Sequence, residues 1–199
     1  MNKIKGSIKS KKFHQIIETA RDLFMRYGIK RITVEEICAT ASVSKMTFYK
    51  YFDNKIDLVL FILKQIYADA EKRYRDIFAQ DIPYSEKAGE IIKLKLESSK
   101  DFSQEMLGDL MQNSIDEVAE FIHKKKQENF RLFLDDMIAA QKKGEIRKDI
   151  NPHFILYILD RMQEMLVDQR ILNMYESPQA LISELTNYFF YGILSNKER

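Results

Sequence analysis

The sequence predicts an all-α protein with a small N-terminal helix-turn-helix domain and a larger helical domain after it, about nine helices in total. Among the 199 residues are only six glycines and three prolines, so long stretches contain no helix breaker. Apolar residues recur every three or four positions along most of the chain. Polar residues in N-cap positions, two of them directly before proline, indicate where helices begin.

The first three helices are expected within the first 52 residues. An apolar stripe predicts a first helix that begins after Ser10 and ends at Gly28. Thr33 and Glu36 have the spacing of a capping box and open a short second helix. Ser44 is the expected N-cap of a third helix over residues 45–51. Two short helices joined by a tight turn are the helix-turn-helix arrangement.

The rest of the chain is expected to continue as helices. Their predicted starts are Asn54, Pro83, Ser103, Ser114, Asn151 and Ser177. The helix from Ser114 is the longest and should end at Gly144, after two lysines. The sequence therefore divides into an N-terminal domain over residues 1–54 and a helical domain over residues 55–199.

Charge is distributed unevenly between these parts. Residues 1–55 contain 12 Lys+Arg and 5 Asp+Glu, a net charge of +7, and residues 56–199 have a net charge of −5. Such an asymmetry is typical of a basic head that meets a polyanion. Charge alone does not separate nucleic acid from an anionic membrane.

Several classes of protein are not indicated. No apolar region follows the basic N-terminus, and the longest apolar run, residues 58–63, is far too short to span a bilayer, so a cytoplasmic protein without membrane contact is expected. The single cysteine, Cys38, is interpreted as a core residue. No metal-ligand spacing, phosphate loop or nucleophile elbow is found, so neither a metal, a cofactor nor catalytic residues are predicted.

The third helix combines an apolar and a polar face. Phe48 and Phe52 are four residues apart and should pack onto the first two helices. The other residues should point mostly outward: Ser44, Lys45, Thr47, Tyr49, Lys50 and Tyr51. Hydroxyls and ammonium groups donate to phosphate oxygens, and a lysine can also reach a guanine edge. This composition fits a helix placed in the major groove of DNA.

Residues 13–63 resemble the DNA-binding domain of the TetR family of bacterial transcriptional regulators, through the pattern Thr33-Val34-x-x-Ile37-x-x-x-Ala41-x-Val43-Ser44-x-x-Thr47-Phe48-Tyr49-x-Tyr51-Phe52-x-x-Lys55. The resemblance implies a homodimeric repressor that binds a palindromic operator and releases it when a small molecule fills the C-terminal domain. It also implies phosphate contacts by Thr33, Ser44, Tyr49, Tyr51 and Lys55, and base-edge or nearby groove contacts by Lys45, Met46, Thr47 and Lys50.

The chain departs from the family pattern at three positions. Ser42 stands in the turn where glycine is frequent, and a positive φ there would cost on the order of 1 kcal/mol. Met46 replaces a common glycine and can touch a thymine methyl group. Tyr51 replaces a frequent histidine but keeps a hydrogen-bond donor.

A small apolar or amphipathic effector is expected in a mostly apolar pocket between the fourth helix and the helix from Ser114. Aromatic residues and methionines supply adaptable apolar lining, and Asn129 is the polar candidate. The candidate residues are Tyr67, Tyr74, Phe78, Phe102, Met106, Met111, Asn129, Phe133 and Met137. Exposed faces and ordinary core packing are the alternatives for these residues.

The last two helices, over residues of about 152–194, have apolar residues on more than one side. A second subunit would cover the additional side, so a homodimer through these helices is expected. Packing within the monomer is the alternative.

Three function classes are compatible with these features. The first is a DNA-binding regulator. The second is a helical adaptor, or a nucleoid-associated DNA-binding protein, that has no small-molecule inducer. The third is an enzyme, which would leave the basic head unexplained. Preference for one duplex over random duplex would separate the first class from an adaptor.

Overall fold

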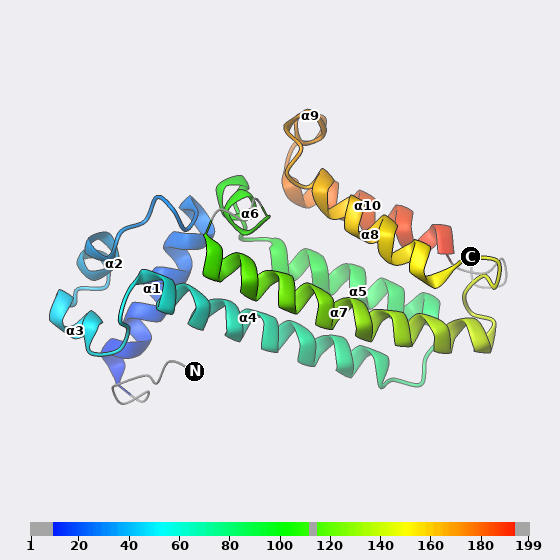
Figure 1. The fold of residues 1–199 in the computed structure, drawn as a ribbon, viewed down its shortest axis with the longest axis horizontal. Coiled ribbons are helices and arrows are strands. Elements are labelled where there is room, and N and C mark those ends of the chain that lie inside the picture. Colours follow the sequence, from blue (N-terminus) through cyan, green and yellow to red (C-terminus); the bar gives the residue numbers. More distant parts are fainter. Residues whose placement is uncertain (1–9, 112–114, 194–199) are drawn as a thin grey trace. The chain divides into compact units, whose positions relative to one another are not determined.

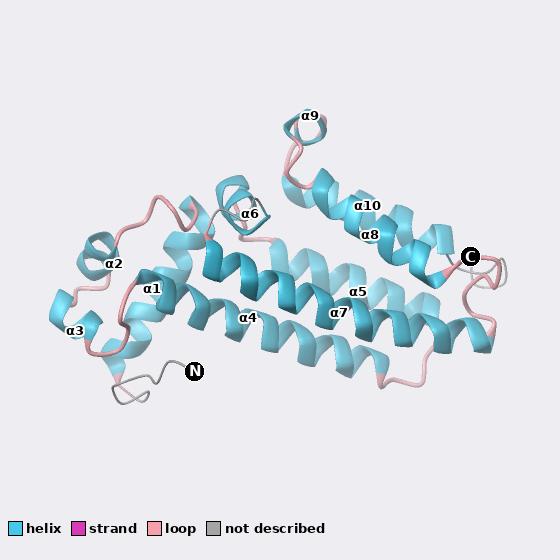
Figure 2. Cartoon of the chain, in the orientation of Figure 1, coloured by secondary structure: helices cyan, strands magenta, loops and turns pink. Residues whose placement is uncertain are grey.

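The computed structural model describes residues 10–111 and 115–193, and every regular element within these ranges is a helix (Figures 1 and 2). The predicted all-α class is confirmed. The described residues form ten helices: α1 (Lys11–Tyr27), α2 (Val34–Thr40), α3 (Lys45–Tyr49), α4 (Lys55–Phe78), α5 (Tyr84–Ser99), α6 (Gln104–Met111), α7 (Asp116–Lys143), α8 (Pro152–Met165), α9 (Gln169–Leu172) and α10 (Pro178–Ile193).

The chain packs as two compact units. Unit 1 comprises Met1–Tyr67 and Asp101–Ile122, and unit 2 comprises Ala68–Lys100 and His123–Arg199. The boundaries between the units fall inside α4 and α7, so each of these helices contributes to both units. The predicted domain boundary at residue 54 was based on the helix-turn-helix pattern and not on packing, and it stays a prediction.

Polar side chains begin most helices where the sequence indicates. The capping box of α2 is complete, because Thr33 accepts from the Glu36 amide and the Glu36 side chain accepts from the Thr33 amide. Side-chain oxygens of Ser44, Asn54, Ser103, Asn151 and Ser177 accept from amides in the first turns of α3, α4, α6, α8 and α10. Ser10 precedes α1 but its side chain forms no cap bond. The predicted start at Ser114 lies outside the described residues.

Two helices are shorter than predicted. The third helix ends at Tyr49 rather than at residue 51. The helix from Pro152 has only 14 residues and does not continue toward the next predicted start at Ser177, because the chain leaves it after Met165 and starts α9 behind a new N-cap, Asp168. The side chain of Asp168 accepts a bond of 2.9 Å from the Arg170 amide. A helix of four residues has no apolar period that a sequence reading could detect.

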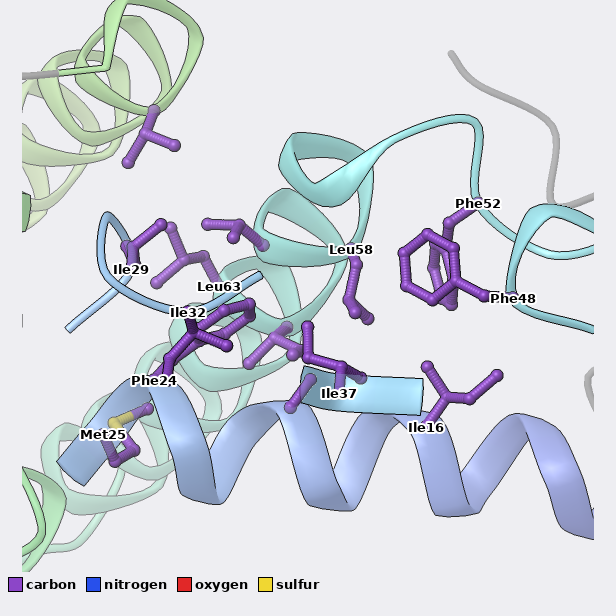
Figure 3. Packing of buried hydrophobic residues seen from close by; sticks show 14 of the residues in the cluster. Ile16, Phe24, Met25, Ile29, Ile32, Ile37, Phe48, Phe52, Leu58 and Leu63 are labelled. Carbon is purple, nitrogen blue, oxygen red and sulfur yellow. The ribbon is translucent and has the colours of Figure 1, made fainter. Parts of the chain in front are cut away.

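The core of unit 1 joins the helix-turn-helix to α1 and α4. Ile16, Ile37, Phe48 and Leu58 are fully buried and converge between these helices (Figure 3). The Phe52 ring stacks on the Phe13 ring at 5.8 Å between centroids, which confirms that the apolar face of the third helix packs inward. Cys38 is also buried in this core, as predicted, and burial raises the pKa of its thiol.

Unit 2 has a separate core formed by α4, α5, α7, α8 and α10. Its buried residues are Ile77, Tyr84, Ala88, Ile91, Leu94, Met137, Ala140, Ile146, Ile155, Phe189, Phe190 and Ile193. α10 packs along α5, and the Gln179 side chain donates to the Ser99 carbonyl at 2.8 Å.

The turn between α2 and α3 is strained at one residue. Ser42 has φ of 52°, in the left-handed region, as considered from the sequence. The turn is closed by the Val43 amide, which donates to the Cys38 carbonyl at 2.9 Å. Serine therefore holds a conformation that glycine adopts without steric cost.

Replacing Ser42 by glycine should stabilise the protein. Relief of the left-handed strain, about 1–2 kcal/mol, outweighs the extra chain entropy of glycine, about 0.5–1 kcal/mol, so a net gain of roughly 0.5–1 kcal/mol is expected. Urea denaturation measures the change. Ser44→Ala is the opposing control, because it removes the N-cap of α3 and should cost about 1 kcal/mol. A lower urea midpoint for Ser42→Gly would contradict this account of the turn.

Candidate nucleic-acid interface

α3 exposes a mixed polar and apolar surface while its other face is buried. Met46 is 83% exposed and Tyr49 is 49% exposed, although both are large and apolar or aromatic. Lys45 and Lys50 are exposed on the same short segment, and Phe48 between them is fully buried. An exposed methionine and tyrosine flanked by two cations form a surface suited to DNA bases and phosphates.

The hydroxyl groups of Thr33, Ser44 and Thr47 already have partners within the protein. Ser44 Oγ accepts from the Thr47 amide at 3.1 Å and lies 2.9 Å from Thr47 Oγ1. Either hydroxyl can donate in that pair, so one of the two protons is still available to a phosphate oxygen. Thr33 Oγ1 donates to Glu36 Oε2 at 2.9 Å, so its proton is committed to the capping box.

Lys45 is paired with an acid of the preceding helix. Its ammonium lies 2.5 Å from Glu35 Oε1, and both side chains are more than half exposed. The hydrogen bond between them lowers the pKa of Glu35 and raises the pKa of Lys45. Contact of Lys45 with DNA requires that this exposed pair, a weak interaction in water, be broken.

The outward orientation predicted for Tyr51 is wrong. Its side chain is only 6% exposed, and its ring packs against the Phe13 ring at 5.3 Å between centroids. α3 has already ended at Tyr49, so helical periodicity no longer sets the direction of residue 51. Because the ring is buried, only the hydroxyl group of Tyr51 could contact a phosphate, and that contact stays a prediction.

Lys55 binds the loop that joins α1 to α2. Its ammonium donates to the carbonyls of Ile29, Lys30 and Ile32 at 2.8, 3.3 and 2.8 Å. An ammonium has three N–H donors, so this arrangement leaves none for a phosphate. Burial lowers the pKa of Lys55, although the carboxylates of Asp109 and Glu36 oppose that shift. The structure thus gives Lys55 a positioning role in place of the predicted direct phosphate contact.

Asp109 of α6 binds the amide groups of the same loop. One carboxylate oxygen, Oδ2, accepts from the amides of Ile29 and Lys30 at 2.7 and 3.0 Å. Gly28, with φ of 81°, makes this approach possible, because a Cβ atom there would lie 2.8 Å from Asp109 Oδ2. We call the contacts of Lys55 and Asp109 with residues 28–32 the loop clamp.

The segment that contains the helix-turn-helix matches a known protein family. The model of a family described as bacterial regulatory proteins, tetR family, matches residues 16–61. The HTH-type transcriptional regulator RutR of Escherichia coli is 34% identical over 95 residues, which are 48% of this chain and 44% of RutR, so the chain matches less than half of that relative. Residues 16–61 thus match the TetR family, whereas the rest of the chain lies outside the family model.

Similarity to other regulators extends over most of the chain. YdgC of Bacillus subtilis, an HTH-type transcriptional regulator, is 21% identical over 196 residues, 96% of each chain. The structure of the regulatory protein TetR from Rhodobacter sphaeroides superimposes with a TM-score of 0.75 at 18% identity, covering 93% of this chain and all of the other. These relatives are HTH-type transcriptional regulators, and the superposition shows that the chain shares the fold of the regulatory protein TetR.

The nine effector candidates are divided between the two units. Tyr67, Phe102, Met106 and Met111 lie in unit 1, and Met106 is part of its core. Tyr74, Phe78, Phe133 and Met137 contribute to the core of unit 2. Asn129, also in unit 2, is exposed to solvent. A pocket lined by this set therefore stays a prediction.

The sequence analysis missed three polar groups of unit 2. The Tyr74 hydroxyl donates to Asp136 Oδ2 at 3.0 Å, and burial raises the pKa of Asp136. The Tyr84 hydroxyl is buried without a hydrogen-bond partner within the described part of the chain, and burial raises its pKa too. The spacing of apolar residues does not reveal these groups, because their neighbours come from helices that are distant in the sequence.

Among residues 10–111 and 115–193, no three His, Cys, Asp or Glu side chains are grouped so that they could hold a metal ion. None of the described helices has both the length and the apolar character needed to cross a bilayer.

Glu35→Gln should tighten binding to all duplexes, since it frees Lys45 from its partner and removes a negative charge beside the DNA. The dependence of log K on log salt should steepen by up to about one unit, as for one additional phosphate contact. Fluorescence anisotropy at several salt concentrations measures this. Glu18→Gln on α1 changes the net charge equally at another exposed site, and an equal effect there would show that only net charge matters.

Lys55→Met should weaken binding to all duplexes without changing the salt dependence, because Lys55 acts on the loop and not on phosphate. The lost donors should also lower the free energy of unfolding by about 1–3 kcal/mol. Lys50→Met is the matched comparison and should flatten the salt dependence by about one unit. If Lys55→Met flattened the salt dependence by the same amount, Lys55 would be shown to contact a phosphate directly.

Proposed function

We propose that the protein is a homodimeric repressor that binds a palindromic operator through α3 and is released by a small-molecule effector bound in unit 2. The observation that carries the proposal is the exposed face of α3, on a helix-turn-helix that matches the TetR family model. Lys45, Met46, Thr47 and Lys50 contact bases or the groove. Ser44, Thr47 and Tyr49 donate to phosphates, and Thr33 contributes through its backbone position.

The proposed dimer uses α8 and α10. Both helices bury one side in the core of unit 2 and expose large aromatic residues on another. Phe154 and Tyr157 of α8 and Tyr188 and Tyr191 of α10 are each more than half exposed. Exposed aromatic residues on two helices favour a protein partner, and a second copy supplies a self-complementary surface. The expected range extends to residue 194, which lies outside the described residues.

Release by an effector requires coupling between unit 2 and the DNA-binding segment. A 100-fold loss of operator affinity corresponds to about 2.7 kcal/mol of coupling free energy, and operator DNA must weaken effector binding by the same factor. Because α6 holds the loop clamp through Asp109, a changed position of α6 would alter the start of α2. A regulator of this kind acts on chromosomal DNA, in accordance with the predicted cytoplasmic location.

Selection of duplexes from a random pool tests this function. The expected result is enrichment of an inverted repeat whose half-sites are about one turn, ~34–36 Å, or a multiple apart. Enrichment of no sequence would overturn the proposal in favour of a nucleoid-associated protein or an adaptor.

Tyr188→Glu should convert the dimer into monomers and abolish operator binding. Tyr188 is 77% exposed, so the substitution should leave the fold of the monomer intact. A carboxylate buried in the interface should weaken the dimer by roughly 30-fold or more. Analytical ultracentrifugation measures the dissociation constant. Ala139→Glu adds the same charge to an exposed position of α7 and should have no effect. An unchanged dimer for Tyr188→Glu would place the interface elsewhere.

A further inference from the structure

The loop between α1 and α2 presents two cations from a backbone that is held in place. Ile29 and Ile32 are buried and point into the core of unit 1 (Figure 3). Lys30 and Arg31, which stand between them in the sequence, are exposed. Because the loop clamp binds the peptide groups of these residues, the two cations project from a loop whose conformation is fixed on both its carbonyl and its amide side.

The side chain of Arg31 is also held. Its Cζ atom lies 5.0 Å from the centroid of the Tyr27 ring, at the end of α1, and Arg26 approaches the same ring at 5.9 Å. Tyr27 itself is half-buried and packs against the core of unit 1. A cation–π contact needs no hydrogen-bond acceptor, so it orients the guanidinium and leaves its N–H donors available.

No acid of the described residues neutralises Arg31. It forms no ion pair among residues 10–111 and 115–193, in contrast to Lys45, which is paired with Glu35. The acid next to the loop, Glu36, uses its Oε2 atom to accept from the amide and the hydroxyl of Thr33. Arg31 is therefore an oriented guanidinium without an anion, which is the form in which arginine binds phosphate bidentately.

The position of Arg31 relates it to the exposed face of α3. The first turns of α2 and α3 are adjacent, since the Lys45 ammonium lies 2.5 Å from Glu35 Oε1. Arg31 precedes Glu35 by four residues, so their Cα atoms are at most roughly 15 Å apart. The major groove is roughly 12 Å wide. With α3 in the groove, Arg31 therefore lies within reach of a sugar-phosphate strand that borders it.

We propose that Arg31 is a further DNA-binding residue, which binds a backbone phosphate outside the base pairs contacted by α3, and that Tyr27 orients it. The inference rests on the proposed DNA-binding function. The planar fork of a guanidinium can bind two oxygens of one phosphate, which anchors the protein on the duplex without reading a base. The loop between α1 and α2 thus contributes to affinity directly, besides setting the start of α2.

The salt dependence of binding tests this contact. With the full-length protein and a duplex of mixed sequence, Arg31→Gln should flatten the dependence of log K on log salt by about one unit for each bound protomer, because one phosphate contact is lost. At about 0.1 M salt this corresponds to a roughly five- to tenfold loss of affinity per protomer. Arg131→Gln removes the same charge from an exposed position of α7 in unit 2 and should leave both values unchanged.

Uncharged phosphate analogues locate the contact on the DNA. In the duplex enriched by selection, each phosphate within and beside a half-site is replaced in turn by a methylphosphonate. At least one replacement outside the base pairs that α3 recognises should weaken binding of the unmodified protein roughly five- to tenfold and leave binding of Arg31→Gln unchanged. Tyr27→Leu should weaken binding about two- to fivefold, and should have no further effect in the Arg31→Gln background, since Tyr27 acts through Arg31.

An unchanged salt dependence for Arg31→Gln would overturn the inference, and so would the absence of any methylphosphonate to which only the unmodified protein responds. Additive effects of Tyr27→Leu and Arg31→Gln would contradict the positioning role of Tyr27. If Lys50→Met still flattens the salt dependence in these cases, the proposed DNA-binding function stands and only the additional contact is wrong. If neither variant changes the salt dependence and selection enriches no sequence, the proposed function fails as well.

Discussion

The position of α2 and α3, the helices proposed to bind DNA, depends on how one short loop is held by two opposite charges. Residues 28–32 join α1 to α2, and the Lys55 ammonium binds their carbonyls while the Asp109 carboxylate binds their amides. Peptide groups are dipoles, so a cation on the carbonyl side and an anion on the amide side stabilise the same loop conformation. Since α2 begins directly after this loop and α3 follows one turn later, the loop clamp sets where the exposed face of α3 lies.

In the free protein, part of the proposed DNA-binding surface is neutralised by internal contacts. Glu35 holds Lys45, and Ser44 and Thr47 bind one another, so phosphate must compete with partners that already exist. Exposed pairs of this kind are weak, and their loss on binding costs little. These pairs lower the affinity for every DNA duplex, whatever its sequence, and leave contacts with base edges unchanged. They therefore favour discrimination between DNA sequences over tight non-specific binding.

Local features of the fold could be predicted from the sequence, and long-range ones could not. The capping box at Thr33, the caps at Ser44 and Asn54, and the packing of Phe48 with Phe52 depend on residues three or four positions apart. Tyr51 and Lys55 were predicted to face DNA, but their partners, Phe13 and the carbonyls of residues 29–32, lie more than twenty positions away. Asn129 was predicted to line a pocket together with Met137, but Met137 is buried in the core of unit 2 and Asn129 is exposed, a difference that depends on neighbouring helices.

The unit boundaries inside α4 and α7 restrict how such a protein can be recombined. Where domains are joined by loops, a sensing domain can be exchanged by cutting the linker. Here two of the three crossings, after Tyr67 and after Ile122, occur within continuous helices. A junction that adds or removes one residue turns everything beyond it by about 100° around the helix axis. A chimaera that keeps its regulation must therefore preserve the helical register of both junctions at once.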